Sequence, residues 1–436
     1  MPIALAPMEG LVDAPLRDLI TRMGGVDWCV TEFLRVTGSL LPAAAFRRIA
    51  PEHAHGWRTP AGTPVRLQLL GSDPASLADN AARGAELGAP VLDLNFGCPA
   101  PTVNKHGGGA ALLDNPGELY RIASAVRAAL PAGVPLTAKM RLGLRDTELT
   151  LDCARALDSA GISELVVHAR TKVEGYRPPA HWQWVAQVKE VVAARVWANG
   201  EVWNLQDWQD IRRESGVDDI MIGRGLVVRP DLAYRIAATN SGAEVVPLDW
   251  HGMLELLEEM ARHMHDAAPQ GNYLPFRLKQ WLKLLMLPGG WPCEAGELFQ
   301  QIRGLTRDTG IGLSGSLVAN EGDRAMSVSV CQQCGACCAA FRVTFHESEL
   351  DSHGGCVPAG LADHETGSLW RLKGTDYARP RCRALVGTIG ESVQCAIYAE
   401  RPSPCREFGA WAVIGVFEDA CHRARSRNGL PPLEEQ

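Results

Sequence analysis

Eight short apolar segments, most of them followed by a stretch long enough for a helix, constrain the fold of this chain more than any other feature. Alternating strands and helices are typical of α/β folds with a parallel sheet, and eight such units are the number in a (β/α)₈ or TIM barrel. The predicted strands are Ile3–Ala6, Trp28–Thr31, Val65–Leu69, Val91–Leu94, Leu136–Met140, Leu165–His168, Val196–Ala198 and Asp219–Ile222.

The positions of polar residues favour the barrel over a doubly wound sheet, which produces a similar pattern of strands and helices. Candidate functional residues follow many successive predicted strands instead of collecting after two of them. In a barrel the carboxyl ends of all strands meet at one mouth, and that mouth carries the chemistry. We therefore predict a TIM barrel over residues 1–243.

Three further segments follow the predicted barrel. A chain of 436 residues exceeds what one hydrophobic core usually contains, so more than one domain is expected. Apolar residues such as Leu257 and Met260 recur at helical spacing and predict a small helical domain over residues 244–310. Residues 311–326 are rich in Gly and Ser and predict a linker. Residues 327–436 hold most of the cysteines and predict a separate domain.

Charge and composition limit the compartment and the partners. The formal net charge is −7, so binding to a nucleic acid would depend on a local basic patch and on shape. The start of the chain lacks a basic leader, and no later segment approaches ~18 uninterrupted apolar residues. We therefore expect a cytoplasmic protein without a membrane partner.

The stretch that follows the fourth predicted strand has the strongest functional pattern. Gly97 and Pro99 exclude a helix, so Asn95 and Cys98 should lie in a loop at the carboxyl end of the strand. The glycines at the end of this stretch allow the backbone to approach a planar or anionic ligand closely. From its position, Cys98 is a candidate acid, nucleophile or ligand, although a cysteine after a strand is also often an inert apolar residue.

Polar residues at the ends of other strands predict a site for a phosphorylated cofactor. Lys139 is a charged residue within an apolar strand, which is costly to bury unless it meets an anion. His168 ends the next strand, and Gln68 ends the third, where it could bond a heterocycle or face solvent. Asn199–Glu201 and Gly223–Gly225 follow the last two strands, where barrels bind phosphate through backbone amides.

The stretch Leu92–Ala110 closely resembles the active-site segment of the tRNA-dihydrouridine synthases, flavoenzymes that reduce particular uridines in tRNA. The resemblance includes Asn95, the Gly-Cys-Pro around Cys98 and the glycine-rich continuation, and it extends over residues 1 to about 310. It implies NADPH as reductant, FMN as flavin and Cys98 as proton donor. The opening and Thr31–Val36 are most similar to the bacterial enzymes that act on uridine 16 of the D-loop.

The resemblance also implies which residues hold the cofactor. For FMN they are Pro7, Met8, Glu9, Gln68, Lys139, His168, Asn199, Gly200, Glu201, Gly223 and Arg224.

Candidates for RNA contacts come from two regions of the sequence. Loops at strand ends carry Arg35, Asn95, Arg141 and Tyr176. In the predicted helical domain, Arg277, Lys279 and Lys283 form the densest basic group, with Trp281 available for stacking. Lys279 and Lys283 are also four residues apart, as expected of a solvated helix face.

The spacing of cysteines predicts a metal site in residues 327–436. The segment Cys331–Cys338 contains overlapping C-x-x-C pairs, a spacing that lets two thiolates reach one tetrahedral ion. An odd total of 13 cysteines without a leader favours metal over disulfides. The candidate ligands are Cys331, Cys334, Cys337, Cys338, Cys382, Cys395 and Cys405. This part of the chain resembles small cysteine-cluster proteins described as zinc- or iron-chelating, which implies metal but no reaction.

Together with these patterns, the resemblance implies a monomeric FMN-dependent enzyme that uses NADPH to reduce one uridine of tRNA, at position 16, to dihydrouridine. A second reading is a barrel flavoenzyme that acts on a free pyrimidine, such as a dihydropyrimidine or dihydroorotate dehydrogenase. A third is a metal-stabilised RNA-binding protein with an inactive barrel. The helical domain and its basic group favour a polymeric substrate, and the cofactor positions favour an enzyme.

Overall fold

The computed structural model describes residues 1–105, 107–243, 245–267, 273–287, 289–302, 334–376, 380–398, 400–402, 404–405 and 419–431. The predicted linker, residues 311–326, lies outside these ranges, as do His106 and Cys331. The chain divides into two compact units, residues 1–284 and 285–436. This division falls within the predicted helical domain, and the four-part division remains a prediction. Among the described residues, no helix combines the length and apolarity needed to span a bilayer.

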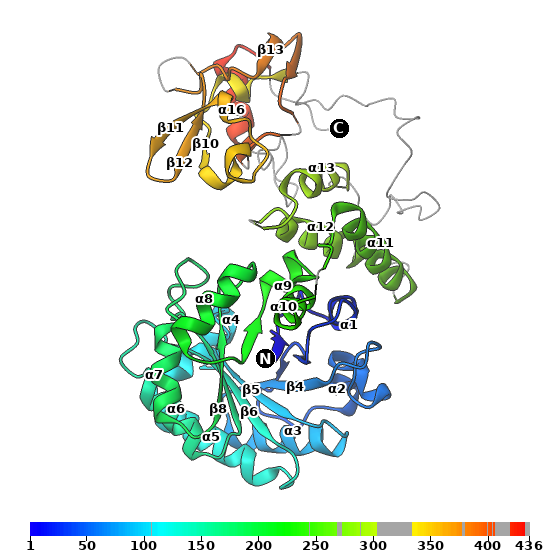
Figure 1. Ribbon diagram of the computed structural model, residues 1–436, viewed down its shortest axis with the longest axis vertical. Helices are drawn as coiled ribbons and strands as arrows, with labels where there is room; N and C mark the ends of the chain where they lie inside the picture. The colour runs from blue at the N-terminus through cyan, green and yellow to red at the C-terminus, as the bar shows by residue number, and fades with distance from the viewer. Residues whose placement is uncertain are drawn as a thin grey trace. The chain divides into compact units, whose positions relative to one another are not determined.

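Parallel strands form a closed barrel in the first unit, with helices around them (Figure 1). Successive strands pair in parallel, and β1 pairs with both β2 and β9, which closes the ring. A two-residue strand, β3 (Leu34–Arg35), also pairs with the end of β4. The barrel strands are β1 (Ile3–Leu5), β2 (Trp28–Val30), β4 (Val65–Leu70), β5 (Leu92–Phe96), β6 (Leu136–Arg141), β7 (Glu164–His168), β8 (Arg195–Asn199) and β9 (Ile220–Ile222). The predicted strands and the TIM barrel are confirmed.

The helices of the barrel begin at residues suited to that position. Asp73 accepts a hydrogen bond from Ser76 N (2.8 Å) at the start of α3, and Asn204 accepts one from Asp207 N (3.0 Å) at the start of α8. The helices are α1 (Ala14–Arg22), α2 (Ala43–Ile49), α3 (Pro74–Glu86), α4 (Pro101–Asn104), α5 (Pro116–Ala129), α6 (Thr150–Ser159), α7 (Gln183–Val191), α8 (Leu205–Ser215), α9 (Arg224–Val228) and α10 (Leu232–Ser241).

Large side chains fill the interior at the amino ends of the strands. Trp28 and Trp197 meet edge to face with ring centroids 4.8 Å apart. The Arg66 guanidinium lies 3.4 Å from the Trp28 ring centroid and donates to Glu164 Oε1 at 3.0 Å. Glu164 also accepts a hydrogen bond from Trp197 Nε1 at 2.6 Å. Because this end of the barrel is packed, the opposite, carboxyl end is the end that remains for a ligand.

Two helices follow the barrel within the first unit, in agreement with the predicted helical segment. They are α11 (Trp250–Ala267) and α12 (Tyr273–Leu285). Trp281 on α12 is fully buried and donates from Nε1 to Val227 O at 2.9 Å. Glu259 on α11 pairs with Arg22 of α1, with 2.6 Å between Oε1 and Nη2. These contacts attach both helices to the barrel.

The second unit combines one more helix of the predicted helical domain with the cysteine-rich part of the chain. Its elements are α13 (Pro292–Ile302), the antiparallel sheet β10 (Thr344–His346), β12 (Leu369–Leu372) and β11 (Ala362–Thr366), the hairpin β13 (Leu385–Thr388) and β14 (Ser392–Cys395), and α16 (Asp419–Arg427). A buried cluster that includes Val343, Phe345, Leu350 and Val357 forms its core.

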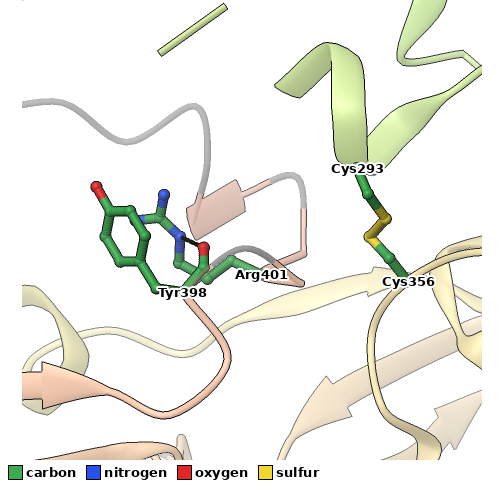
Figure 2. The surroundings of a disulfide bond; sticks show 4 residues. All are labelled: Cys293, Cys356, Tyr398 and Arg401. Carbon is green, nitrogen blue, oxygen red and sulfur yellow. Dashed lines mark hydrogen bonds between the residues drawn. A yellow bond between two sulfur atoms is a disulfide. The ribbon is translucent and has the colours of Figure 1, made fainter. Parts of the chain in front are cut away.

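A disulfide between Cys293 and Cys356 joins α13 to the segment before β11 (Figure 2). The Cα atoms of the two residues lie 6.2 Å apart. The expectation of metal instead of disulfides is therefore wrong for this pair. The two cysteines are 63 residues apart in the sequence, so no local spacing could have indicated the bond.

Candidate active site

The side chain of Asn95 organises the loop that carries Cys98. Asn95 Oδ1 accepts hydrogen bonds from Gly97 N and Cys98 N, both at 2.9 Å. Cys98 O in turn accepts from Asn104 Nδ2 at 2.9 Å and from Ala110 N at 3.1 Å. Asn95 was predicted to contact RNA, and the structure gives its amide oxygen a role inside the protein. The loop is therefore held rigidly at the carboxyl end of β5.

Cys98 itself is nearly buried. Its exposed fraction is 9%, and it packs in a cluster with Phe33, Leu70 and Val103. Gly109 is needed beside it, because φ there is +59° and a Cβ would lie 2.8 Å from Cys98 O. Burial raises the pKa of the Cys98 thiol, so the group is protonated at neutral pH.

Gln68 and Lys139 lie on the strands that flank this loop. Gln68 on β4 is fully buried, and its Oε1 accepts a hydrogen bond from Asn95 Nδ2 at 2.8 Å. Lys139 on β6 is in register with Asn95 and has an exposed fraction of 9%. Burial, together with the charge of Arg141, lowers the pKa of Lys139 to about 7. Within the described residues its ammonium makes no hydrogen bond or ion pair, which is the environment expected of a group that meets an anionic ligand.

Arginines from several strand ends surround His168. Arg141 extends β6 and donates to Gly97 O at 2.9 Å, while Arg170 follows β7 and donates from Nε to Arg177 O at 2.7 Å. Burial and the nearby cations, including Arg141, Lys139, Arg170 and Arg224, hold the pKa of His168 well below its ordinary value. His168 is therefore neutral, and the excess positive charge favours an anion at this part of the mouth.

The loops after β8 and β9, which were predicted to bind phosphate, contain two residues with positive φ. Gly200 has φ of +122°, and Glu201 has φ of +62°, which is unusual for a residue with a side chain. Glu201 forms an ion pair with the fully buried Arg170. A Cβ at Gly223 would lie 3.6 Å from Met8 Sδ, so Met8 from the loop after β1 borders the loop after β9.

The remaining residues predicted for the cofactor also lie at strand ends. Asn199 ends β8 and donates from Nδ2 to Met221 O at 2.8 Å. Pro7 is half-buried and Glu9 is exposed, in the loop after β1. Burial raises the pKa of Glu9, opposed by the charge of Arg35. The structure thus brings the predicted cofactor residues to one end of the barrel.

Tyr176 forms an exposed aromatic surface at the same end. Its exposed fraction is 52%. The Arg224 and Arg141 guanidinium carbons lie 4.6 Å and 5.2 Å from its ring centroid. Arg35 is also exposed, and it donates to Thr102 O at 3.2 Å in the loop that follows Cys98. These residues are placed where a polymeric substrate could touch the mouth.

Arg277, predicted as part of a basic group that contacts RNA, is buried in the structure. Its exposed fraction is 1%, and it donates to Gly10 O at 2.7 Å and to Leu11 O. It also pairs with Asp13, with 3.1 Å between Nη2 and Oδ2. The expectation of an exposed basic group is wrong for this residue, because the fold uses the guanidinium to hold carbonyl oxygens of the loop after β1. Lys279 is half-buried and Lys283 is exposed.

The predicted metal ligands are only partly gathered. Cys382 lies in the buried cluster of the second unit, and Cys338, Cys395 and Cys405 pack against that cluster. Cys334 instead accepts a hydrogen bond from Arg425 Nη1 at 2.9 Å. Cys337, three residues further along the chain, is half-buried. Within the described ranges, no three His, Cys, Asp or Glu side chains are arranged closely enough to hold a metal ion.

Three residues in or next to the mouth of the barrel were not predicted from the sequence. Asp93 is a carboxylate within an apolar strand, the same signal that identified Lys139. Arg170 follows His168 by two residues, so an extended chain points both side chains the same way. Trp203 stacks under the Arg224 guanidinium, 4.8 Å from centroid to Cζ, and donates to Glu201 Oε1 at 3.1 Å. Trp203 lies in a loop, and no sequence pattern marked it as a functional residue.

Comparison with known proteins supplies the family. Residues 4–295 match the family model "Dihydrouridine synthase (Dus)", and residues 330–422 match "Putative zinc- or iron-chelating domain". A tRNA-dihydrouridine(16) synthase of Pseudomonas putida is 57% identical over 70% of this chain and 93% of its own length. Proteins of the same name from Aquipseudomonas alcaligenes and Ralstonia nicotianae are 59% and 50% identical, over 95% and 91% of their lengths and 70% of this chain. The chain therefore belongs to the dihydrouridine synthase family of enzymes.

Proposed function

We propose that this enzyme reduces uridine 16 of tRNA to 5,6-dihydrouridine, with FMN as its flavin and NADPH as the reductant. The names of its relatives support the substrate. The observation that carries the proposal is the arrangement of a buried, protonated Cys98 beside a mouth lined with cations and tight glycine turns. We place the enzyme in the cytoplasm with its substrate and propose that it acts as a monomer.

The residues at the mouth fit FMN. Lys139 is buried without an anionic hydrogen-bond partner in the described part of the chain, and Gln68 offers an amide on the neighbouring strand. Around the turns at Gly200, where φ is positive, and at Gly223, backbone groups and the Arg224 guanidinium would hold the phosphate. When bound, FMN would supply the hydride that reduces the uracil double bond. Replacing Lys139 with Ala should weaken flavin binding.

Cys98 would supply the proton that completes the reduction. Hydride addition at C6 of uracil leaves negative charge across C5 and O4, and the product forms when a positioned acid protonates C5. The thiol has a raised pKa because it is buried, so it carries the proton without assistance. Asn95 holds the loop through Gly97 N and Cys98 N, which keeps the donor in one place.

We propose that tRNA contacts the exposed surface formed by Arg35 and Tyr176, beside the half-buried Arg224, with Lys279 contributing from α12. An aromatic ring flanked by guanidinium groups suits an unstacked base and its phosphates. Since Arg277 is buried, we expect it to act on RNA binding only by holding the loop after β1.

The test is reduction of unmodified tRNA by the purified protein and NADPH, with the modified position mapped by mass spectrometry of nuclease fragments. Dihydrouridine at position 16 supports the proposal. Reduction of free uracil but not of tRNA would indicate the pyrimidine dehydrogenase reading. A colourless protein that cannot be reconstituted with FMN would exclude both enzymatic readings as stated.

For the second family match, we propose that residues 330–422 bind zinc or iron. The chemistry of the donors fits these metals, since thiolates prefer zinc and iron. Cys338, Cys395 and Cys405 pack against the buried cluster that contains Cys382, and metal binding would have to draw such thiols closer together than they lie in the described residues. Metal analysis of the purified chain tests the proposal, with serine variants of these four cysteines compared with Cys153→Ser in the barrel. Equal metal content in all variants would place the ligands elsewhere.

A further inference from the structure

We propose that Trp203 is a positioning residue of the flavin site, which holds the Arg224 guanidinium in place for the phosphate of the cofactor. This inference rests on the proposed flavin-dependent function, in which Arg224 binds that phosphate. It assigns a role to a residue of the loop after β8 that the predicted set of cofactor residues does not include.

Aromatic rings hold the guanidinium of Arg224. This residue begins α9 and is half-buried. Its Cζ atom lies 4.6 Å from the ring centroid of Tyr176 and 4.8 Å from that of Trp203. Within the part of the chain that the structure describes, the guanidinium donates no hydrogen bond and forms no ion pair. Cation–π contacts use the flat faces of the group, so its N–H donors, which lie in its plane, are available to an anion.

The loop after β8 and the start of α9 approach each other at the backbone. A Cβ at Gly225 would lie 2.0 Å from Val202 O, so a side chain at this position would force the two segments apart. Trp203 follows Val202, and Arg224 precedes Gly225. The backbone contact therefore places the indole and the guanidinium next to each other.

Two hydrogen bonds fix Trp203 in this position. Its backbone N donates to Asp207 Oδ2 at 2.8 Å, and its indole Nε1 donates to Glu201 Oε1 at 3.1 Å. Trp203 is half-buried, whereas Tyr176 has an exposed fraction of 52%. Because Trp203 is the more enclosed of the two rings, we expect it to set the position of the guanidinium.

Glu201 connects the indole of Trp203 to the interior of the protein. Its carboxylate pairs with Arg170, whose side chain is fully buried. Arg170 also donates from Nε to Arg177 O at 2.7 Å and to Pro179 O at 3.3 Å. The φ angle of Glu201 is +62°, a costly conformation that persists where surrounding contacts impose it. The acceptor of the indole N–H is therefore itself rigidly placed.

The test compares the binding of FMN and riboflavin to the flavin-free full chain, because riboflavin has the same ring system and lacks the phosphate. The Kd of each flavin is measured by fluorescence titration. Without the indole, Arg224 must be ordered when the phosphate binds, and ordering one long side chain weakens affinity by about five- to tenfold. Trp203→Leu should therefore raise the Kd of FMN by about this factor and leave the Kd of riboflavin unchanged.

Two further variants separate a positioning role from a general loss of packing. Trp203→Phe keeps an aromatic face for the guanidinium and should bind FMN more tightly than Trp203→Leu does. In the Arg224→Met background, Trp203→Leu should cause no further loss of FMN affinity, since the group that Trp203 positions is absent.

Arg195→Met is the matched control, because Arg195 Cζ lies 5.2 Å from the Trp197 ring centroid at the amino end of β8. It should leave both Kd values unchanged. An unchanged Kd of FMN in Trp203→Leu, equal weakening of both flavins, or an additive loss in the double variant would overturn the inference and leave the proposed function standing. Failure of the wild-type chain to bind FMN would overturn the proposed function and this role of Trp203 with it.

Discussion

At the scale of single residues, the protein uses burial to hold protonation states. Cys98 is a buried thiol whose pKa is raised, whereas His168 is buried among cations and its pKa is lowered. The thiol is therefore protonated and the imidazole neutral at neutral pH. The Cys98 loop keeps its shape through Asn95 and Asn104, so substitution of the thiol leaves the surrounding hydrogen bonds in place.

Cys98→Ala should retain FMN and oxidise NADPH, but its rate of dihydrouridine formation should fall by about 10²-fold or more, as expected for loss of a general acid. The measurement is single-turnover reduction of tRNA. The ordinary pKa of a cysteine thiol is about 8.5, and burial raises the pKa of Cys98 above its ordinary value. The rate of tRNA reduction by the wild type should therefore stay constant beyond about pH 8.5 and decline only at higher pH, where the thiol loses its proton. A Cys98→Ala enzyme that modifies tRNA at the wild-type rate would assign the proton to another donor.

At the scale of elements, α12 is attached to the barrel by one buried charged side chain. Arg277 donates to Gly10 O and Leu11 O and pairs with Asp13, which also caps α1 by accepting from Leu16 N at 3.1 Å. Breaking a buried charge pair typically costs about 3–5 kcal/mol. We expect Arg277→Met to lower the free energy of unfolding by an amount of that order.

The measurement for Arg277→Met is urea unfolding of the full chain. Lys283→Ala on the same helix is the control, since exposed positions usually change stability by less than about 0.5 kcal/mol. Equal stability of the two variants would mean that the loop after β1 is held by other contacts. A loss of tRNA affinity in Arg277→Met without a loss of stability would indicate that Arg277 contacts the RNA directly.

The disulfide between Cys293 and Cys356 is a second element-scale contact. It closes a loop across a sequence separation of 63, for which chain entropy predicts stabilisation of about 4 kcal/mol. Cys293→Ser should therefore lower the melting temperature of the second unit under oxidising conditions. Treatment of the wild type with a reducing agent should remove the difference. Detection of two free thiols by mass spectrometry of the oxidised wild type would contradict the bond.

At the scale of the whole molecule, the catalytic barrel and the cysteine-rich part match separate family models. We predict that residues 1–310, with Cys293→Ser to remove the unpaired thiol, fold, bind FMN and reduce tRNA at a rate within a few-fold of the full chain. The comparison is made at equal flavin content. Loss of tRNA reduction with flavin still bound would show that residues 327–436 contribute to the reaction.

The sequence by itself determined the barrel, because strand and helix periodicities and the turns between them are local properties. It also determined most of the mouth: Cys98 and His168 lie at strand ends, Gln68 and Lys139 lie in the carboxyl halves of their strands, and parallel strands carry such positions to one end of a barrel. Pattern and register were enough for these residues.

Only the tertiary structure decided which polar groups meet. Arg277 reads as part of a basic helix face, yet packing of α12 on the barrel buries it against backbone oxygens. Asp93 accepts hydrogen bonds from Gln68 and Thr137 on two neighbouring strands, and Cys293 meets Cys356 across a long separation in the chain. Burial and pairing depend on which surfaces come into contact, and sequence spacing carries no information about contacts between distant segments.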